Sequence, residues 1–306
     1  MTAMTPMKMM PPPAWGSAVL RDVPAPSKLN LFLHVVGRRS DGYHLLESVF
    51  VLIDWADTLH FERRSDGQLR RQDLTAHLPE EDLCLRAARA LQEAAGVHWG
   101  VDIAIDKQVP SGAGMGGGSS DAATVLLALN RLWDLRWPRE RLQELAVSLG
   151  ADVPFFVGGH NAFVQGIGER LMPVEVPIQG FAVVKPEAGI ATADIFGSPD
   201  LQRNSPSAII LGSLESDAMS ALIAGSGHND LQPVAEARCT EVAQAARWLE
   251  QRFGNSRMTG SGSAVFSRVG NAEPPLATWP AEDLPQGWVG RWCRSLPQHP
   301  LVSWAD

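Results

Sequence analysis

The feature that most constrains this chain is a glycine-rich segment, Pro110 to Ser120, with the sequence PSGAGMGGGSS. Five glycines in eleven positions let the backbone take positive φ angles and approach a ligand closely, so that consecutive amides can converge on an anion. The alanine-rich stretch that follows predicts a helix over Ser120 to Trp133, whose positive N-terminal end adds to this attraction. As a turn without a ligand, so many glycines would only lower stability. The segment therefore predicts a phosphate-binding loop.

Other glycine loops share part of this pattern. A Walker A loop closes with Gly-Lys-Ser/Thr, whereas Gly118 is followed by two serines, so that loop is excluded. Gly112, Gly114 and Gly117 satisfy G-x-G-x-x-G, and Asp134 lies at a tolerable distance for a ribose-binding acid. The preceding strand alternates apolar and polar residues, however, while a buried parallel strand is nearly all apolar. A dinucleotide-binding dehydrogenase is therefore the least favoured alternative.

Composition bounds the class of protein. The chain has 306 residues and a net charge of -8, which argues against nucleic acid as a partner because binding to its phosphates needs a broad basic surface. No stretch approaches the roughly 18 apolar residues of a membrane span. The three cysteines lie far apart and predict buried free thiols in a reducing compartment: Cys84, Cys239 and Cys293. We expect a soluble, cytoplasmic protein that binds a small molecule, with neither nucleic acid nor membrane as a partner.

Local patterns predict mixed strands and helices. Lys28, Asn30 and His34 stand at even spacing in an apolar run, so they should project from one face of a strand over Ser27 to Val36. A turn over Gly37 to Tyr43 should lead to an antiparallel strand over Leu46 to Ile53. The further elements expected are helices over Asp82 to Ala95, Pro138 to Leu149 and Glu236 to Phe253, a short helix opened by Thr192, and strands over Val101 to Lys107, Phe181 to Val184, Ala264 to Arg268 and Trp288 to Cys293.

Strands and helices that do not alternate regularly favour an α+β fold with two domains. The Met- and Pro-rich start lacks the apolar core of a secretion signal and is interpreted as a flexible extension. The expected division is an extension over 1–21, a first domain over 22–170, a second domain over 171–296 and a tail over 297–306.

Three segments, in order, give a family resemblance. PSGAGMGGGSSDAAT resembles the phosphate loop of the GHMP kinases, the family of galactose, homoserine, mevalonate and phosphomevalonate kinases, and SKLNLFLHV and TGSGSAVF resemble two further segments of that family. RSDGYHLLESVF, LGADVPFF and NDLQPVA are similar to the branch that phosphorylates a cytidine-diphosphate-linked alcohol. The resemblance covers about residues 22 to 296. It implies a two-domain GHMP kinase fold, with an ATP domain, a second α+β domain and the active site in the interdomain cleft.

The resemblance also implies roles, carried over by position. Lys28 and Asp152 would be the catalytic pair, and ATP and Mg2+ the cofactors. Tyr43, His44 and Phe196 would hold the cytosine, while Asn30 and Thr192 would lie near the substrate's polar parts. The ATP-binding set would be Lys107, near the adenine end, and Pro110, Ser111, Gly112, Ala113, Gly114, Met115, Gly116, Gly117, Gly118, Ser119 and Ser120. Met115 stands where the family usually has leucine, a change of similar volume.

The residues alone leave simpler interpretations open. Asp152, before Val153-Pro154, could cap a turn, and Lys28 could be a solvated strand residue. Tyr43-His44 could stack on a base or simply pack, and Phe196 on a short helix would ordinarily be core. Ser119, Ser120 or Asp121 could contribute an oxygen to magnesium, without a choice among them. The segment 229–235 could support the active site or pack the domains.

Two alternative functions remain at this stage. One is another GHMP kinase, of the homoserine or mevalonate type, for which Tyr43-His44 would have no base to contact. The other is a catalytically silent nucleotide-binding protein, which would keep the loop but should lack Lys28 or Asp152. The sequence has both residues.

Overall fold

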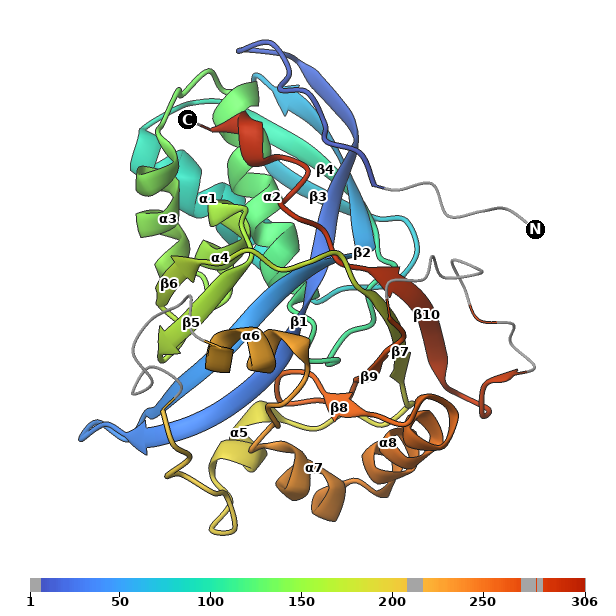
Figure 1. The fold of residues 1–306 in the computed structure, drawn as a ribbon. Helices are drawn as coiled ribbons and strands as arrows, with labels where there is room; N and C mark the ends of the chain where they lie inside the picture. Colours follow the sequence, from blue (N-terminus) through green and yellow to red (C-terminus); the bar gives the residue numbers. More distant parts are fainter. Residues whose placement is uncertain (1–6, 208–216, 271–278, 280–282, 306) are drawn as a thin grey trace.

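The computed structural model describes residues 7–207, 217–270, 279 and 283–305 (Figure 1). Two sheets organise it. The first has six strands in the order β3-β4-β2-β5-β6, with β1 paired to β2, and the second has four in the order β10-β7-β9-β8. The chain leaves the first sheet at Pro173 and enters the second at Gly180. The mixed fold predicted from the sequence is confirmed.

The first sheet is built on a long antiparallel pair. Its strands are β1 (Val19–Arg38), β2 (His44–Arg64), β3 (Leu69–Asp73), β4 (Gly100–Asp106), β5 (Ala162–Gly166) and β6 (Arg170–Pro173). Both long strands exceed the predicted ranges. The prolines at 24 and 26 argued against a strand there. Among the described strands β1 pairs only with β2, so its other edge tolerates proline.

Four helices cover this sheet: α1 (Leu83–Ala95), α2 (Gly117–Leu132), α3 (Arg139–Val147) and α4 (Val153–Gly158). Figure 1 shows α2 between the other helices and the sheet, and nearly every side chain of its last three turns is buried. Along β4, Val101, Ile103 and Ile105 are buried and alternate with half-buried residues, as predicted for a strand with one core face.

The second sheet carries its own helices. Its strands are β7 (Gly180–Lys185), β8 (Arg257–Met258), β9 (Val265–Arg268) and β10 (Val289–Arg294). The helices of this half are α5 (Thr192–Phe196), α6 (Asp217–Ala224), α7 (Gln232–Arg238) and α8 (Thr240–Phe253). The two halves are joined where β1 reaches the second: Leu33 bridges to Asn229 in parallel.

The two ends of the described chain meet on the first half. The amide of Met10 donates to the carbonyl of Pro300, and the Trp304 indole donates to the carbonyl of Met10, both at 3.0 Å. The tail carries a short 3₁₀ helix over Val302–Trp304 and reaches α2, where Arg131 donates to the carbonyl of Trp304. The proposed extension thus includes residues that pack against the tail. Residues 1–6 lie outside the described range.

Three expectations about single elements are corrected. Helix α2 begins at Gly117 rather than Ser120, directly after the left-handed Gly116. The helix predicted from Glu236 is two helices, because Cys239 is extended between α7 and α8. Cys239 is also half-buried, whereas Cys84 and Cys293 are buried as expected.

His34 does not share a face with Lys28 and Asn30. Asn30 pairs with Phe50 and Leu33 with Ser48, so β1 carries one more residue than β2 over this interval. Such a bulge reverses the alternation of side chains. Leu33 therefore lies on the cavity side with Lys28 and Asn30, and His34 packs against the rings of Phe32 and His228 instead.

Candidate active site

The glycine loop presents unpaired amides at the start of α2. Gly112, Gly114 and Gly116 have φ angles of 64°, 71° and 71°, a left-handed region that other residues rarely adopt. Helix α2 has no side-chain cap, so its first amides are open to the adjoining cavity of about 300 Å³, which the loop lines. Amides and helix dipole together form an anion site.

A second glycine loop, residues 259–264, holds the first in place. The amides of Ser263 and Ala264 donate to the carbonyls of Gly112 and Ala113, at 3.1 and 3.2 Å. A Cβ on Gly114 would lie 2.2 Å from the carbonyl oxygen of Thr259, so only glycine fits there. This close approach explains why two distant glycine motifs occur in one chain.

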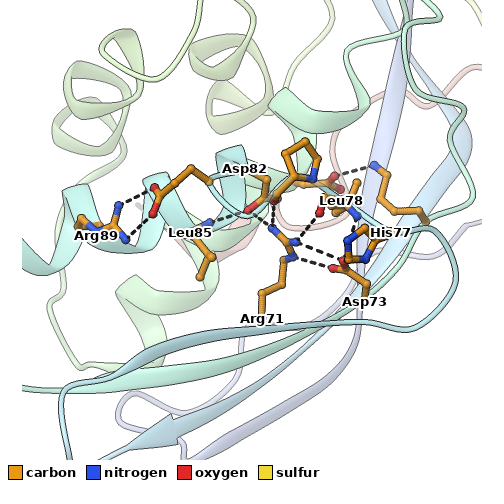
Figure 2. Close-up of polar contacts among 11 residues, drawn as sticks. Arg71, Asp73, His77, Leu78, Asp82, Leu85 and Arg89 are labelled. Atoms are coloured by element: carbon orange, nitrogen blue, oxygen red, sulfur yellow. Dashed lines mark hydrogen bonds and ion pairs between the residues drawn. The ribbon is translucent and has the colours of Figure 1, made fainter.

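One arginine, Arg71, braces the segment that leads into α1, and Figure 2 shows its contacts. The largely buried Arg71 guanidinium donates to the carboxylates of Asp73 and Asp82, each at 2.6 Å. It also donates to the carbonyls of Leu78 and Pro79. Asp82 in turn caps α1 by accepting from the amide of Leu85. The contacts fix residues 73–83, whose Leu78, Asp82 and Leu83 line the cavity.

Lys107 lies on the floor of the same cavity between two carboxylates. Its ammonium contacts Asp57 and lies 2.7 Å from Asp121 Oδ2. Burial lowers the pKa of Lys107, but the two carboxylates outweigh it and raise that pKa overall. Burial raises the pKa of Asp121 well above its ordinary value, against the opposing effect of Lys107. The Asp57 carboxylate also accepts hydrogen bonds from the amides of Gln108 and Val109, which anchors the start of the loop.

Lys28 and Asp152 come together beside the loop. Lys28 Nζ lies 3.6 Å from Asp152 Oδ2, donates to Asn30 Oδ1 at 2.5 Å and lies over the Phe50 ring. Burial lowers the pKa of Lys28, and the Asp152 carboxylate opposes this. The Lys28 amide donates to the carbonyl of Met115, so the strand that carries this ammonium is tied to the phosphate loop. A solvated Lys28 is excluded.

Asp152 stands at the N-cap of α4 but makes no capping hydrogen bond with its side chain. Its carboxylate is 29 % exposed and faces Lys28. Helix α4 runs beneath the loop, where a Cβ on Gly116 would lie 3.0 Å from the Phe156 ring. The geometry therefore favours a chemical role for Asp152 over the capping interpretation.

A second cavity, of about 330 Å³, adjoins the first. Gly112, Gly114 and Gly116 line both. The second is also lined by Lys28, Asn30, Asp152, Thr192 and Phe196. Thr192 and Ser261 share a hydrogen bond of 2.7 Å, which ties the start of α5 to the second glycine loop. Donor and acceptor molecules could thus meet at one loop.

Of the three residues expected around the base, Phe196 lines this cavity and Tyr43 and His44 do not. His44 and Phe196 stack with ring centroids 5.2 Å apart and planes at 30°. Tyr43 is 61 % exposed and does not line the cavity. Phe196 is half-buried, so it is not a core residue. The structure therefore brings His44 and Phe196 together and leaves the Tyr43 side chain exposed.

The sequence did not single out several residues that shape this site. Arg71, Asp57 and Thr259 each act through long-range contacts, which no local pattern reports. Thr259 Oγ1 accepts the amide of Asn30 at 2.9 Å, and Asn30 Nδ2 donates to Ser48 Oγ. Thr259 alone carried a signal, because it begins the motif TGSGSAVF, whereas Asp57 and Arg71 lie far from both glycine motifs in the sequence.

Asn229, from the segment whose role was open, donates to the carbonyls of Met258 and Gly260, so it supports the second glycine loop. In the described part of the chain, no group of three or more His, Cys, Asp or Glu residues could hold a metal ion. Nor does any described helix combine the length and the apolar character needed to cross a membrane.

Family models and relatives match this chain along its length. The family model "GHMP kinases N terminal domain" matches residues 82–160, and "GHMP kinases C terminal" matches residues 212–275. A 4-diphosphocytidyl-2-C-methyl-D-erythritol kinase of Methylibium petroleiphilum is 62 % identical, covering 94 % of this chain and 98 % of the relative. One from Variovorax paradoxus is 56 % identical, with 93 % and 98 % covered.

Solved structures give the same result. A crystal structure of 4-(cytidine 5'-diphospho)-2C-methyl-D-erythritol kinase superposes with a TM-score of 0.74 at 36 % identity, covering 89 % of this chain and 98 % of that one. A mevalonate kinase superposes with a TM-score of 0.65 at 12 % identity, covering 92 % and 100 %, which shows a shared fold only. The resemblance stated from the sequence motifs is confirmed.

Proposed function

This chain belongs to the 4-diphosphocytidyl-2-C-methyl-D-erythritol kinases of the GHMP family, and we propose that it moves the terminal phosphate of ATP onto the 2-hydroxyl of 4-diphosphocytidyl-2-C-methyl-D-erythritol. It is a small-molecule kinase. The reaction belongs to the non-mevalonate route to isoprenoid precursors. Its need for ATP supports a place of action in the cytoplasm.

One observation carries the proposal: two cavities share three glycines of the phosphate loop, and the Lys28–Asp152 pair lines the second. Phosphoryl transfer depends mainly on positioning the reactants and neutralising charge. A nucleotide with its phosphates on the loop would direct its terminal phosphate toward the pair. A hydroxyl held in the second cavity would then face it.

The pair has complementary tasks. The Asp152 carboxylate would accept the proton of the attacking hydroxyl, and the Lys28 ammonium would orient that hydroxyl and stabilise its developing negative charge. Asn30 holds Lys28 through its Oδ1, and its own Nδ2 is held by Ser48. This chain of hydrogen bonds keeps the ammonium at the junction of the two cavities.

The residues beside the loop also fit a magnesium ion. Ser119 and Asp121 are oxygen-bearing residues that line the nucleotide cavity, and Asp121 Oδ1 is buried without a hydrogen-bond partner. Magnesium usually takes one or two protein oxygens and completes its shell with phosphates and water. When bound, the ion would neutralise charge on the transferred phosphate. Ser120 fits less well, because its hydroxyl donates to the carbonyl of Pro26.

The competing functions are disfavoured by particular observations. A catalytically silent nucleotide-binding protein would have no use for an Asp152 carboxylate that makes no capping hydrogen bond and faces Lys28. A homoserine or mevalonate kinase would not need His44 stacked on Phe196, which lines the second cavity. The relatives above are named for the cytidine-linked substrate.

The test is ATP consumption with magnesium and three acceptors offered separately: the cytidine-linked methylerythritol, homoserine and mevalonate. We expect turnover of the first alone, and a loss of about 100-fold or more in kcat for Asp152→Asn, the range of general-base catalysis. Asp134→Asn is the matched control, since Asp134 is exposed and, in the part of the chain that the structure describes, forms an ion pair with Arg136 alone. Turnover of another acceptor, or full activity of Asp152→Asn, would overturn the proposal.

A further inference from the structure

The loop after α5 contains an arginine that bonds in two directions. Arg203 donates to the carbonyls of Ser198 at 2.7 Å, Leu201 at 2.9 Å and Phe196 at 3.4 Å. Its Nε donates to His44 Nε2 at 3.0 Å. Three bonds therefore fix the guanidinium to its own loop, and the fourth reaches the start of β2 in the other half of the molecule.

This fourth bond determines which nitrogen of His44 carries the proton. A guanidinium is only a donor, so His44 Nε2 must offer its lone pair, and in the neutral ring the proton then stands on Nδ1. Burial lowers the pKa of His44, and the nearby Arg203 and Arg38 lower it further. The ring is thus kept neutral as well as oriented.

His44 Nδ1 is left as a donor without a protein acceptor among the described residues. The same ring stacks on Phe196, whose carbonyl also binds Arg203. One arginine is therefore bonded to both residues of this stacked pair, of which Phe196 lines the acceptor cavity.

A donor at this place distinguishes pyrimidines. Cytosine has a lone pair at N3, whereas uracil has an N–H there. A donor aimed at N3 can form a hydrogen bond with cytosine. With uracil it would face the N3–H group, so two donors would oppose each other and neither would have a partner, which strongly disfavours uracil.

We propose that Arg203 is a positioning residue for base recognition: it holds His44 as the Nδ1–H tautomer so that this nitrogen donates to N3 of a cytosine and rejects uracil. The inference rests on the proposed function for its substrate. The tautomer itself can be measured without any substrate.

The first experiment is heteronuclear NMR of the histidine rings in the ligand-free protein, for wild type, Arg203→Gln and Arg203→Lys. Wild type should show His44 as the Nδ1–H tautomer. Arg203→Gln should show a mixture of tautomers and a His44 pKa that rises toward its ordinary value, and Arg203→Lys should fall between the two. Arg247→Gln, at an exposed site on α8, is the matched control and should resemble wild type.

The second experiment measures kcat and KM with cytidine-linked and uridine-linked methylerythritol. In Arg203→Gln the preference for cytidine in kcat/KM should fall by about tenfold, the equivalent of one ordinary hydrogen bond, through a higher KM for the cytidine compound. The kcat should change little, because Lys28 and Asp152 are untouched. Arg203→Lys should restore part of the preference.

The outcomes separate this inference from the proposed function. A wild-type His44 with its proton on Nε2, or an unchanged cytidine preference in a folded Arg203→Gln, would overturn the role of Arg203. No turnover of either compound would instead overturn the proposed function, and the tautomer would still decide whether Arg203 controls His44.

Discussion

Replacing Gly114 with alanine tests whether the two glycine loops form one unit. Its φ of 71° costs an L-residue about 1–2 kcal/mol. The added Cβ would lie 2.2 Å from the backbone oxygen of Thr259, so the loops must separate, at an overpacking cost of about 1–3 kcal/mol. We expect the free energy of unfolding of the ligand-free protein to fall by about 2–5 kcal/mol, measured by chemical denaturation.

Gly96→Ala is the matched control. Gly96 has a φ of 64° and nothing within 4 Å of its would-be Cβ, so it should lose only the backbone cost of about 1–2 kcal/mol and keep wild-type activity. In Gly114→Ala, kcat/KM for ATP should fall by about 30-fold or more, because the competent loop is depopulated by at least about 2 kcal/mol. Equal losses of stability and activity in the two variants would refute the loop contact.

Three further predictions follow from single contacts. Thr259→Val removes the acceptor of the buried Asn30 amide, so the free energy of unfolding should fall by about 1–3 kcal/mol and kcat should drop. Thr259→Ser keeps the acceptor and should retain both, and equal kinetics for the two variants would contradict this. Arg71→Gln leaves two carboxylates without their partner, so it should lower the free energy of unfolding by about 3 kcal/mol and raise KM for ATP. Arg70→Gln should do neither, because Arg70 is exposed and, among the described residues, its side chain is hydrogen-bonded to Gln68 alone. Burial, then Arg139, lowers the pKa of His299 from 6.5 to about 3, so below pH 6.5 the unfolded chain binds a proton that the folded chain does not. As the pH falls from 6.5 to about 3, the free energy of unfolding of wild type should therefore drop by about 1.4 kcal/mol more per pH unit than that of His299→Asn. Equal slopes of the two proteins in denaturation at several pH values would disprove it.

Local patterns were enough for the parts of the fold that local physics determines. The glycine loop was predictable because positive φ angles require glycine, and β4 because its alternation reports one buried face. The meeting of Lys28 with Asp152 was inferred from the family resemblance alone. Their separation in sequence, with α1 and α2 between them, leaves no periodic signal that would bring them together.

Other features depend on contacts that a single sequence does not encode locally. The bulge after Asn30 moved His34 away from the cavity, because one extra residue in β1 changes which side chains share a face. In the sequence, Arg71 and Arg203 look like ordinary polar residues of a strand and a loop. Their importance comes from the several carbonyl and carboxylate oxygens that surround each one in the folded chain.

The most direct measurement of the central claim is phosphorus NMR of the reaction mixture with ATP, magnesium and 4-diphosphocytidyl-2-C-methyl-D-erythritol. The account predicts one new phosphomonoester, coupled to the 2-position of the methylerythritol, for each ADP formed, and none with Asp152→Asn. Release of inorganic phosphate without a new ester, or an ester at another hydroxyl, would contradict it.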